Sequence, residues 1–318
     1  MSPQPRQLVL PFAARAPAPG RPGGVALERR GGVELVEMTC RSILNWVQGS
    51  RASDFYSINP YRGCEHACAY CYARYTHEFL DQPGSADFER RVYVKVNVPE
   101  VLVHDLRHAK VYEHGISFGS ATDPYQPAEH RFRLTRRLLE GLLPFRGFSL
   151  SIVTKSALVE RDVELLAELA SRHELAVLFS CMTTDPVLQR ALEPRASAPE
   201  RRLQAMARLS AAGVHTELLV APLMPGLNDG EEALGRLCRR AREAGAVSVF
   251  GQALFLFEAS RRRFFSWLEQ HRPELTEPYR RAFARSRELD REVRDELSDR
   301  LTRAAAAAGL GAGRRTVR

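Results

Sequence analysis

Three cysteines with close spacing are the residues in this chain best suited to chemistry. Cys64, Cys68 and Cys71 form the pattern Cys-x3-Cys-x2-Cys, and no other cysteine lies near them. Three thiolates at this spacing on one tight loop can converge on three corners of an iron–sulfur cube, whereas a ferredoxin cluster takes four. One iron would then stay open to a non-protein ligand. An open iron can hold a reacting molecule, so the pattern favours a catalyst over an electron carrier.

Zinc is the main alternative for the same three thiols. Zinc sites usually pair Cys-x2-Cys with a second ligand pair far downstream. His66 and His77 could complete a Cys3His site, but no second pair is evident. The chain also lacks the short apolar core of a secretory signal, and three clustered thiols without an export signal indicate a metal site in a reducing compartment. We therefore expect a cytoplasmic protein.

Alternating strands and helices must position this loop. Arg161 to Arg172 and Pro199 to Ala212 are typical of amphipathic helices, the second with Pro near its start and Gly213 after its end. Strand–helix alternation predicts βα units and a parallel sheet. Six units are fewer than the eight of a closed barrel, which leaves an open partial barrel or a doubly wound sheet. The six expected strands are Phe55 to Ile58, Gly115 to Gly119, Phe148 to Thr154, Leu175 to Cys181, Val214 to Pro222 and Val247 to Phe250.

Charge is concentrated at the two ends of the chain. The 318 residues carry a net charge of +8; residues 1–32 hold five Arg and one Glu, and residues 261–318 hold fifteen Arg and nine acids. Basic ends can attract a polyanion such as nucleic acid, but an Arg-rich composition explains them more simply. We expect a flexible basic leader over 1–37, a catalytic body over 38–260, and a mainly helical extension with a loose tail over 261–318. No run of 18 apolar residues occurs, so no membrane partner is expected.

The residues around the cysteines resemble one enzyme family. Cys-x3-Cys-x2-Cys with Tyr70 before the third cysteine is similar to the signature of the radical S-adenosylmethionine (SAM) superfamily. Further segments resemble its spore photoproduct lyase-like branch, also called DNA repair photolyase-like, and the resemblance runs from about residue 38 to 255. These segments are NPYRGC and CYAR around the cysteines, KVNVPEVL at 95–102, SFGSATDPYQPAE at 117–129 and SIVTKS at 151–156.

The resemblance implies a fold, two cofactors and a reaction. The fold is a partial (β/α)6 TIM-like barrel of the α/β class, here with a mainly helical C-terminal extension. The three cysteines would hold a 4Fe–4S cluster whose open iron is chelated by SAM. A reductant such as flavodoxin or ferredoxin would supply the electron that cleaves SAM, and the resulting 5′-deoxyadenosyl radical takes a hydrogen atom from the substrate.

By the same resemblance, residues at the ends of later strands would bind SAM. Asp123, in the strand-two segment Ser120 to Asp123, would accept from the SAM amino group; the alternative is a turn in which its side chain caps backbone N–H groups. Lys155 would pair with the methionine carboxylate, unless it is an ordinary solvated lysine. Ser180 would touch the ribose or carboxylate. The segment Ala221 to Gly226 would pack near adenine, or be a plain Pro/Gly loop.

One departure bears on the substrate. Spore photoproduct lyase uses a catalytic Cys beside its strand-two segment, and Gly119 to Asp123 contains none. Tyr125 lies nearby and could pass a hydrogen atom or be a packed aromatic. The sequence therefore predicts a radical SAM enzyme of unknown substrate, with a nucleic-acid lesion left open. The alternative function is a non-catalytic Fe–S or zinc binding module.

Overall fold

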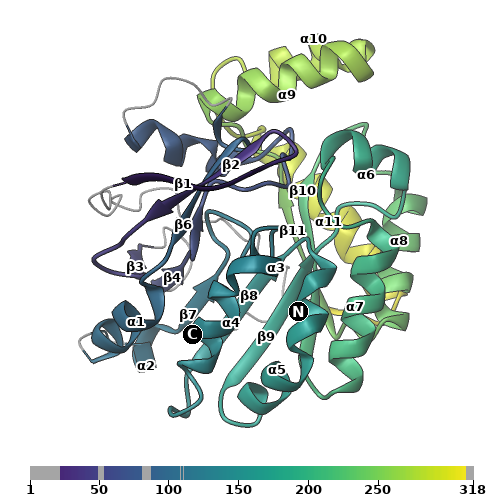
Figure 1. Cartoon of the computed structure of the whole chain (residues 1–318). Helices are drawn as coiled ribbons and strands as arrows, with labels where there is room; N and C mark the ends of the chain where they lie inside the picture. Colours follow the sequence, from purple (N-terminus) through teal and green to yellow (C-terminus); the bar gives the residue numbers. More distant parts are fainter. Residues whose placement is uncertain (1–21, 49–53, 81–86, 108, 110, 313–318) are drawn as a thin grey trace.

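The central strands of the main sheet all run in the same direction around an open barrel. The computed structural model describes residues 22–48, 54–80, 87–107, 109 and 111–312. Six parallel strands form the centre of an eight-stranded sheet, and they lie side by side in chain order (Figure 1). They are β4 (Phe55–Ile58), β7 (Ile116–Phe118), β8 (Ser149–Thr154), β9 (Glu174–Ser180), β10 (His215–Leu223) and β11 (Ser248–Ala253).

Strand order decides between the two expected architectures. A doubly wound sheet reverses its strand order at a switch point, and this sheet has no reversal among the six parallel strands. The partial (β/α)6 barrel is therefore confirmed, and each expected strand is present within two or three residues of its predicted ends. Short strands border the barrel: β3 (Leu44–Val47) pairs antiparallel with β4, and β12 (Gly311–Ala312) pairs parallel with β11.

Helices cover the outer face of the sheet, where every second side chain of the strands joins the large apolar core. On β9, Leu175, Val177 and Phe179 belong to the large core beneath the helices. The intervening Ala176 and Leu178 belong to a small cluster inside the barrel. The connecting helices are α1 (Val98–Leu106), α2 (Val111–His114), α3 (Glu129–Phe132), α4 (Leu134–Glu140), η3 (Ala157–Asp162), α5 (Val163–Ala170), α6 (Pro186–Leu192), α7 (Pro199–Ala211) and α8 (Glu231–Glu243).

The prediction of a flexible leader over residues 1–37 is wrong for residues 22–37, which belong to a second, four-stranded sheet. Residues 22–37, assigned to a flexible segment on their Pro, Gly and Arg content, form most of the hairpin of β1 (Pro22–Arg30) and β2 (Val33–Met38). β2 pairs with β6 (Arg91–Lys95), which pairs with β5 (Tyr61–Arg62). The four apolar side chains of β2, Val33, Leu35, Val36 and Met38, are all buried, and this burial outweighs the polar composition of the segment. Residues 1–21 lie outside the described residues.

The C-terminal part is mainly helical, as expected. It contains α9 (Glu258–His271), α10 (Pro273–Ala282) and α11 (Arg291–Ala307). α11 packs against α8 and β11, whereas α9 packs against η1 (Tyr72–Leu80), the helix that follows the cysteine loop. Of the predicted loose tail, Gly311 and Ala312 form β12, and residues 313–318 lie outside the described residues. Within the described part of the chain, every helix is too short or too polar to span a bilayer.

Candidate active site

The cysteine loop lies between β5 and η1 and is buried. Cys64 and Cys68 are buried, Cys71 is partly buried, and none forms a disulfide. Burial raises the pKa of all three thiols, and for Cys64 the neighbouring charges of Asp123, Cys68 and Cys71 add to the increase. The three thiols are therefore close enough to influence one another.

Gly63 permits the sharp entry into this loop. Its φ of +90° lies in the left-handed region, and a Cβ there would lie 2.8 Å from the carbonyl oxygens of both Phe88 and Arg91. At the other side of the loop, the buried Arg74 donates to the Cys68 carbonyl at 3.1 Å and pairs with Glu89. These contacts fix the backbone that carries the thiols.

The segment after β7 is joined to the same loop by hydrogen bonds. Thr122 Oγ1 donates to the Gly63 carbonyl at 2.5 Å, and the Glu65 amide donates to Gln126 Oε1 at 2.9 Å. The Tyr72 hydroxyl donates to the Ser120 carbonyl. The strand-two segment therefore sets the position of the cysteine loop.

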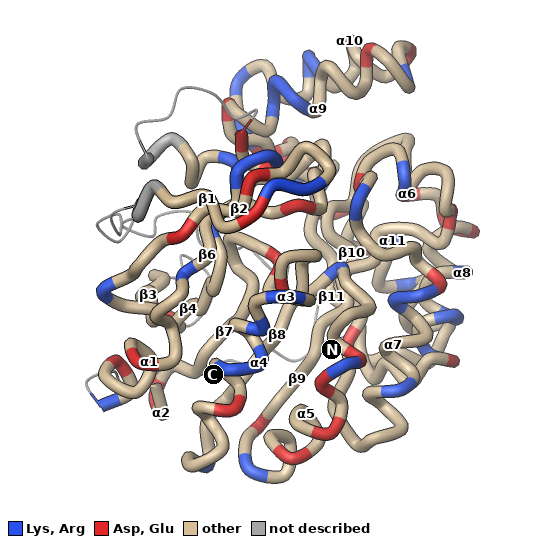
Figure 2. Tube along the Cα trace, viewed as in Figure 1, with Lys and Arg blue, Asp and Glu red and all other residues tan. Residues whose placement is uncertain are grey.

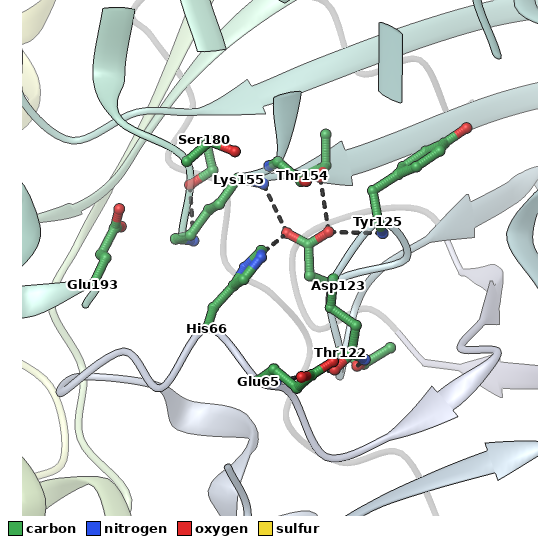
Figure 3. Close-up of polar contacts among 12 residues, drawn as sticks. Glu65, His66, Thr122, Asp123, Tyr125, Thr154, Lys155, Ser180 and Glu193 are labelled. Carbon is green, nitrogen blue, oxygen red and sulfur yellow. Dashed lines mark hydrogen bonds and ion pairs between the residues drawn. The ribbon is translucent and has the colours of Figure 1, made fainter. Parts of the chain in front are cut away.

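Asp123 is the centre of this contact. Its Oδ1 accepts from the Tyr125 amide at 2.9 Å and from Thr154 Oγ1 at 2.7 Å, and its Oδ2 accepts from the Lys155 amide at 2.7 Å. His66 Nδ1 lies 3.4 Å from Oδ2, as Figure 3 shows. Burial opposes ionisation of Asp123, but the charge and hydrogen bonds of its partners lower its pKa to about 2. The Asp123 carboxylate thus accepts hydrogen bonds from its own turn, at Tyr125, and from the end of β8, at Thr154 and Lys155.

Lys155 and Ser180 come together at the ends of β8 and β9. Lys155 Nζ donates to Ser180 Oγ at 2.9 Å, and it lies 5.8 Å from the centre of the Tyr70 ring in the cysteine loop. Burial disfavours the cation, but the negative charge of Glu193 and the neighbouring Cys68 raise the pKa of Lys155 overall. A cationic amine therefore lies beside the loop.

A buried ion pair beneath this contact was not predicted from the sequence. Glu193 and Arg202 are both fully buried and pair with each other. Glu193 also accepts from the Tyr70 hydroxyl, and Arg202 donates to the Ser180 carbonyl at 2.7 Å. Burial raises the pKa of Glu193, but the positive charges of Arg202 and Lys155 lower it by a larger amount, so the group is a carboxylate. The pair links the cysteine loop to the end of β9.

Comparison with known proteins identifies the family. The family model described as Radical SAM superfamily matches residues 58–238, which include the cysteine loop and most of the barrel. The chain belongs to the radical SAM superfamily. Uncharacterized protein Rv2578c of Mycobacterium tuberculosis (strain ATCC 25618 / H37Rv) is 39% identical over 271 residues, covering 85% of this chain and 79% of that protein. Uncharacterized protein MJ0683 of Methanocaldococcus jannaschii is 29% identical over 242 residues, covering 76% and 85%.

Solved structures of spore photoproduct lyase share this radical SAM fold. One, complexed with dinucleoside spore photoproduct, has a TM-score of 0.65 and 19% identity, with 87% of this chain and 80% of that chain covered. A doubly substituted mutant of the same enzyme, with bound AdoMet and dinucleoside spore photoproduct, has a TM-score of 0.64 at the same identity and coverage. At this identity the likeness concerns the fold.

Family membership implies a 4Fe–4S cluster and SAM, and the cysteine loop fits such a cluster. The chain offers three free thiols on one loop, two of them buried and one partly buried, in a position where neighbouring thiols affect each other's ionisation. Across the described residues, no three His, Cys, Asp or Glu side chains are arranged to hold a single metal ion. A cluster instead binds each thiolate at a separate iron.

The two histidines considered as zinc ligands have other neighbours. His66 points toward Asp123 (Figure 3). His77 Nε2 lies 3.1 Å from the Arg91 carbonyl, and its ring packs against Phe88 and Tyr93. Burial is the main cause that lowers the pKa of His77 to about 4.

The remaining expected residues are divided between the site and the core. Tyr125 is fully buried and points away from Asp123 in Figure 3. The Arg161 guanidinium lies over the Tyr125 ring, 6.0 Å from the centre of that ring. Cys181 packs in the helix-side core, opposite the face of Ser180. The segment Ala221 to Gly226 is held by Asn228, which donates to the Pro222 carbonyl at 2.9 Å and accepts from the Met224 amide at 2.7 Å.

Proposed function

We propose that this radical SAM chain is an enzyme that binds a 4Fe–4S cluster through Cys64, Cys68 and Cys71 and SAM beside Lys155 and Ser180. The observation that carries the proposal is the Lys155–Ser180 contact, which places a cation and a hydroxyl at the strand ends beside the cysteine loop. Parallel barrels build their active sites at this end of their strands.

The chain's own residues would bind and orient the cofactors. When bound, the cluster and SAM supply a one-electron cleavage that leads to hydrogen-atom abstraction from the substrate. The Lys155 ammonium would pair with the methionine carboxylate, and the Ser180 hydroxyl would hold a second polar group of SAM. Asp123 would act through its bond to the Lys155 amide, and its capacity to accept from the SAM amino group remains a prediction.

A small apolar cluster inside the barrel would help to keep water from the reaction. Leu178, Leu219 and Phe250 form a buried cluster on the inner face, directly within the barrel whose rim carries Ser180. Exclusion of water strengthens electrostatic contacts and protects reactive species. We propose that residues 38–260, with the β1–β2 hairpin, form the catalytic unit, and that the helices after residue 261 support it.

For the substrate we propose nucleic acid as the class to test first. The solved neighbours hold a dinucleoside photoproduct. In this chain a pocket of about 410 Å³ on the β1–β2 hairpin is lined by Arg29, Arg30 and Arg90 together with one acid, Glu34, which pairs with Arg29 at 2.7 Å. Arg30 Nη2 lies 3.5 Å from Glu65 in the cysteine loop. Guanidinium groups bind phosphates well. Because Gly119 to Asp123 contains no thiol, we do not propose the cysteine-dependent hydrogen return of the lyase.

The decisive experiment uses anaerobically purified and reconstituted protein. Iron and sulfide are quantified, the protein is reduced with dithionite in the presence of SAM, and 5′-deoxyadenosine is measured. Cluster iron together with 5′-deoxyadenosine supports the proposal. Binding of damaged and undamaged DNA is then measured at several salt concentrations, since phosphate contacts make affinity fall with salt.

The alternative is a non-catalytic Fe–S or zinc binding module. It predicts metal without SAM cleavage. A cluster whose spectrum does not change on addition of SAM would favour the iron–sulfur module, and zinc in place of iron would favour the zinc module.

A further inference from the structure

The two helices that follow the barrel, α9 and α10, form a hairpin around shared aromatic rings. The ring of Phe264 on α9 lies 5.4 Å from that of Tyr279 on α10 and 6.0 Å from that of Trp267. All three side chains are buried. Figure 1 shows the two helices side by side at one end of the molecule, apart from α5 and α7 on the outside of the barrel. The pair α9 and α10 is called the helical hairpin below.

One side of the helical hairpin holds the loop that follows β10. The Tyr279 hydroxyl donates to the Pro225 carbonyl at 2.8 Å. Leu275 packs against the same loop, since a Cβ on Gly226 would lie 3.3 Å from its side chain. Arg272 Nη2, between the two helices, lies 3.5 Å from the Gly226 carbonyl. Contacts from α10 and from the residue before it therefore hold this loop in place.

The same loop lies beside the proposed SAM site. Ser180, the last residue of β9, is the register partner of Leu219 on β10. β10 ends four residues later, at Leu223, so residues 224–226 leave the barrel at the rim that carries Ser180. Loops at this rim supply the binding groups of parallel barrels. A contact that fixes Pro225 therefore fixes a segment next to the site.

The other side of the helical hairpin is joined to the cysteine loop. Trp267 Nε1 on α9 donates to the Ala191 carbonyl of α6 at 2.8 Å. The next carbonyl of α6, that of Leu192, accepts from the Ala69 amide between Cys68 and Cys71 at 2.8 Å. α9 also packs against η1, which follows the cysteine loop. Two consecutive carbonyls of α6 thus connect α9 to the loop that carries the thiols.

The outer surface of the helical hairpin has no dominant charge. Figure 2 shows both acidic and basic residues along α9 and α10. Arg262 pairs with Glu258 at 3.2 Å, and Arg280 pairs with Glu269 at 2.6 Å. Long-range attraction of a charged partner needs a surface of mainly one sign. The specific contacts of the hairpin are instead those that it makes with the barrel.

We propose that the helical hairpin positions the SAM site and that Tyr279 and Trp267 are its positioning residues. They act through the loop after β10 and through the end of α6. The inference rests on the proposed function, because it requires a cluster on the cysteine loop and SAM beside Ser180. The hairpin contacts both parts of that site, so it sets how they lie relative to each other. Binding and reaction depend steeply on such alignment.

The test removes one hydrogen bond from the cluster-loaded, full-length protein. Tyr279→Phe removes the hydroxyl and keeps the ring in its packing. Tyr112→Phe, at an exposed tyrosine on α2, is the matched control. SAM affinity is measured by equilibrium dialysis. Iron content, thermal stability and the electron paramagnetic resonance spectrum of the reduced cluster without SAM are measured on the same samples.

We expect Tyr279→Phe to bind SAM about fivefold more weakly, a loss of the size of one hydrogen bond. Its iron content and its cluster spectrum without SAM should match those of the wild type. Lower thermal stability with unchanged SAM affinity would show a purely structural role and overturn the proposal, as would an equal loss of affinity in Tyr112→Phe. Failure of the proposed function gives a different result, because the wild-type protein itself would then bind no SAM.

A double variant tests whether the two contacts act as one unit. Trp267→Phe removes the indole N–H and keeps a ring beside Phe264, and it should also weaken SAM binding about fivefold. For Trp267→Phe/Tyr279→Phe we expect a loss of about five- to tenfold, because residues that act through one element are not additive. Unchanged affinity in Trp267→Phe, or a double loss equal to the product of the single ones, would overturn the hairpin as a single positioning element.

Discussion

Lys155 Nζ and Ser180 Oγ lie 2.9 Å apart, across the ends of two neighbouring barrel strands. Residues far apart in sequence thus form one polar contact beside Tyr70. The contact contains a cation and a hydroxyl donor, the two components needed to bind a carboxylate. The first prediction concerns this contact.

Lys155→Met should weaken SAM binding by about 10- to 100-fold, since hydrogen bonds to charged groups contribute about 1.5–3 kcal/mol. Ser180→Ala should have a smaller effect, about fivefold. Equilibrium dialysis with the cluster-loaded protein measures both. Iron content and thermal stability serve as controls, and SAM affinity that stays at the wild-type value in Lys155→Met would contradict the assignment.

Cys68→Ala should lose the cluster iron while the fold is kept. The thiol supplies one iron ligand in the proposed site, and alanine fits its buried volume. Cys238→Ala, in the buried face of α8, is the matched control and should keep its iron. Iron and sulfide analysis with circular dichroism measures both properties. Iron at the wild-type level in Cys68→Ala would exclude this residue as a ligand.

Gly63→Ala should abolish cluster loading and destabilise the protein. A non-glycine residue at this φ costs about 1–3 kcal/mol, and its Cβ would also clash with two carbonyl oxygens. Gly213→Ala separates the two effects, because Gly213 has a φ of +82° but nothing within 4 Å of the added Cβ. We expect Gly213→Ala to lose some stability and keep its iron. The same behaviour in both variants would show that the close approach is unimportant.

Asp123 should make stability depend on acid pH. Its pKa of about 2 lies below the usual 3.8, so the folded state favours the carboxylate. The corresponding stabilisation, about 2 kcal/mol, is fully present above pH about 3.8 and is lost as pH falls through about 2. Urea unfolding from pH 5 to pH 2 should show a shallower slope for Asp123→Asn than for wild type. Asp299→Asn, an exposed site on α11, should keep the wild-type slope; equal slopes in all three proteins would refute the prediction.

The buried Glu193–Arg202 pair should be costly to break from one side. Arg202→Met leaves an unpaired buried carboxylate and should lower the free energy of unfolding by about 3–5 kcal/mol. The double variant Glu193→Leu/Arg202→Met should recover part of this loss, because no buried charge remains. Urea unfolding of the apoproteins measures both free energies of unfolding. A double variant that is less stable than Arg202→Met would show that the pair contributes through its other hydrogen bonds.

The sequence predicted the barrel well because strand and helix patterns are local. Each barrel strand is a short apolar run, and Pro199 and Gly213 correctly bracket α7. The cysteine loop, Lys155 and Ser180 were predicted as site residues from spacing and family resemblance; the structure places Lys155 and Ser180 together beside the loop, and their roles stay predictions. Their common location follows from the alignment of parallel strand ends at one edge of the sheet.

Two features could not be predicted for physical reasons. Arg202 lies in a chain with 43 arginines, and nothing local distinguishes a fully buried one from its solvated neighbours on α7. Its partner Glu193 becomes close only when α6 and α7 fold onto β9. The β1–β2 hairpin was also missed, because the Pro, Gly and Arg content of the segment hides the buried apolar side chains of β2, which do not follow a simple alternation.

The pairing of β2 with β6 has a practical consequence for truncated proteins. β6 carries Arg91, whose carbonyl contacts His77, and it is joined to the cysteine loop through β5. A shortened protein beginning near residue 39 would lose β1 and β2 and expose the backbone N–H and C=O groups along one side of β6. Such open strand edges pair with other chains and cause aggregation. The apparently dispensable N-terminal residues from 22 onward should therefore be kept for soluble expression.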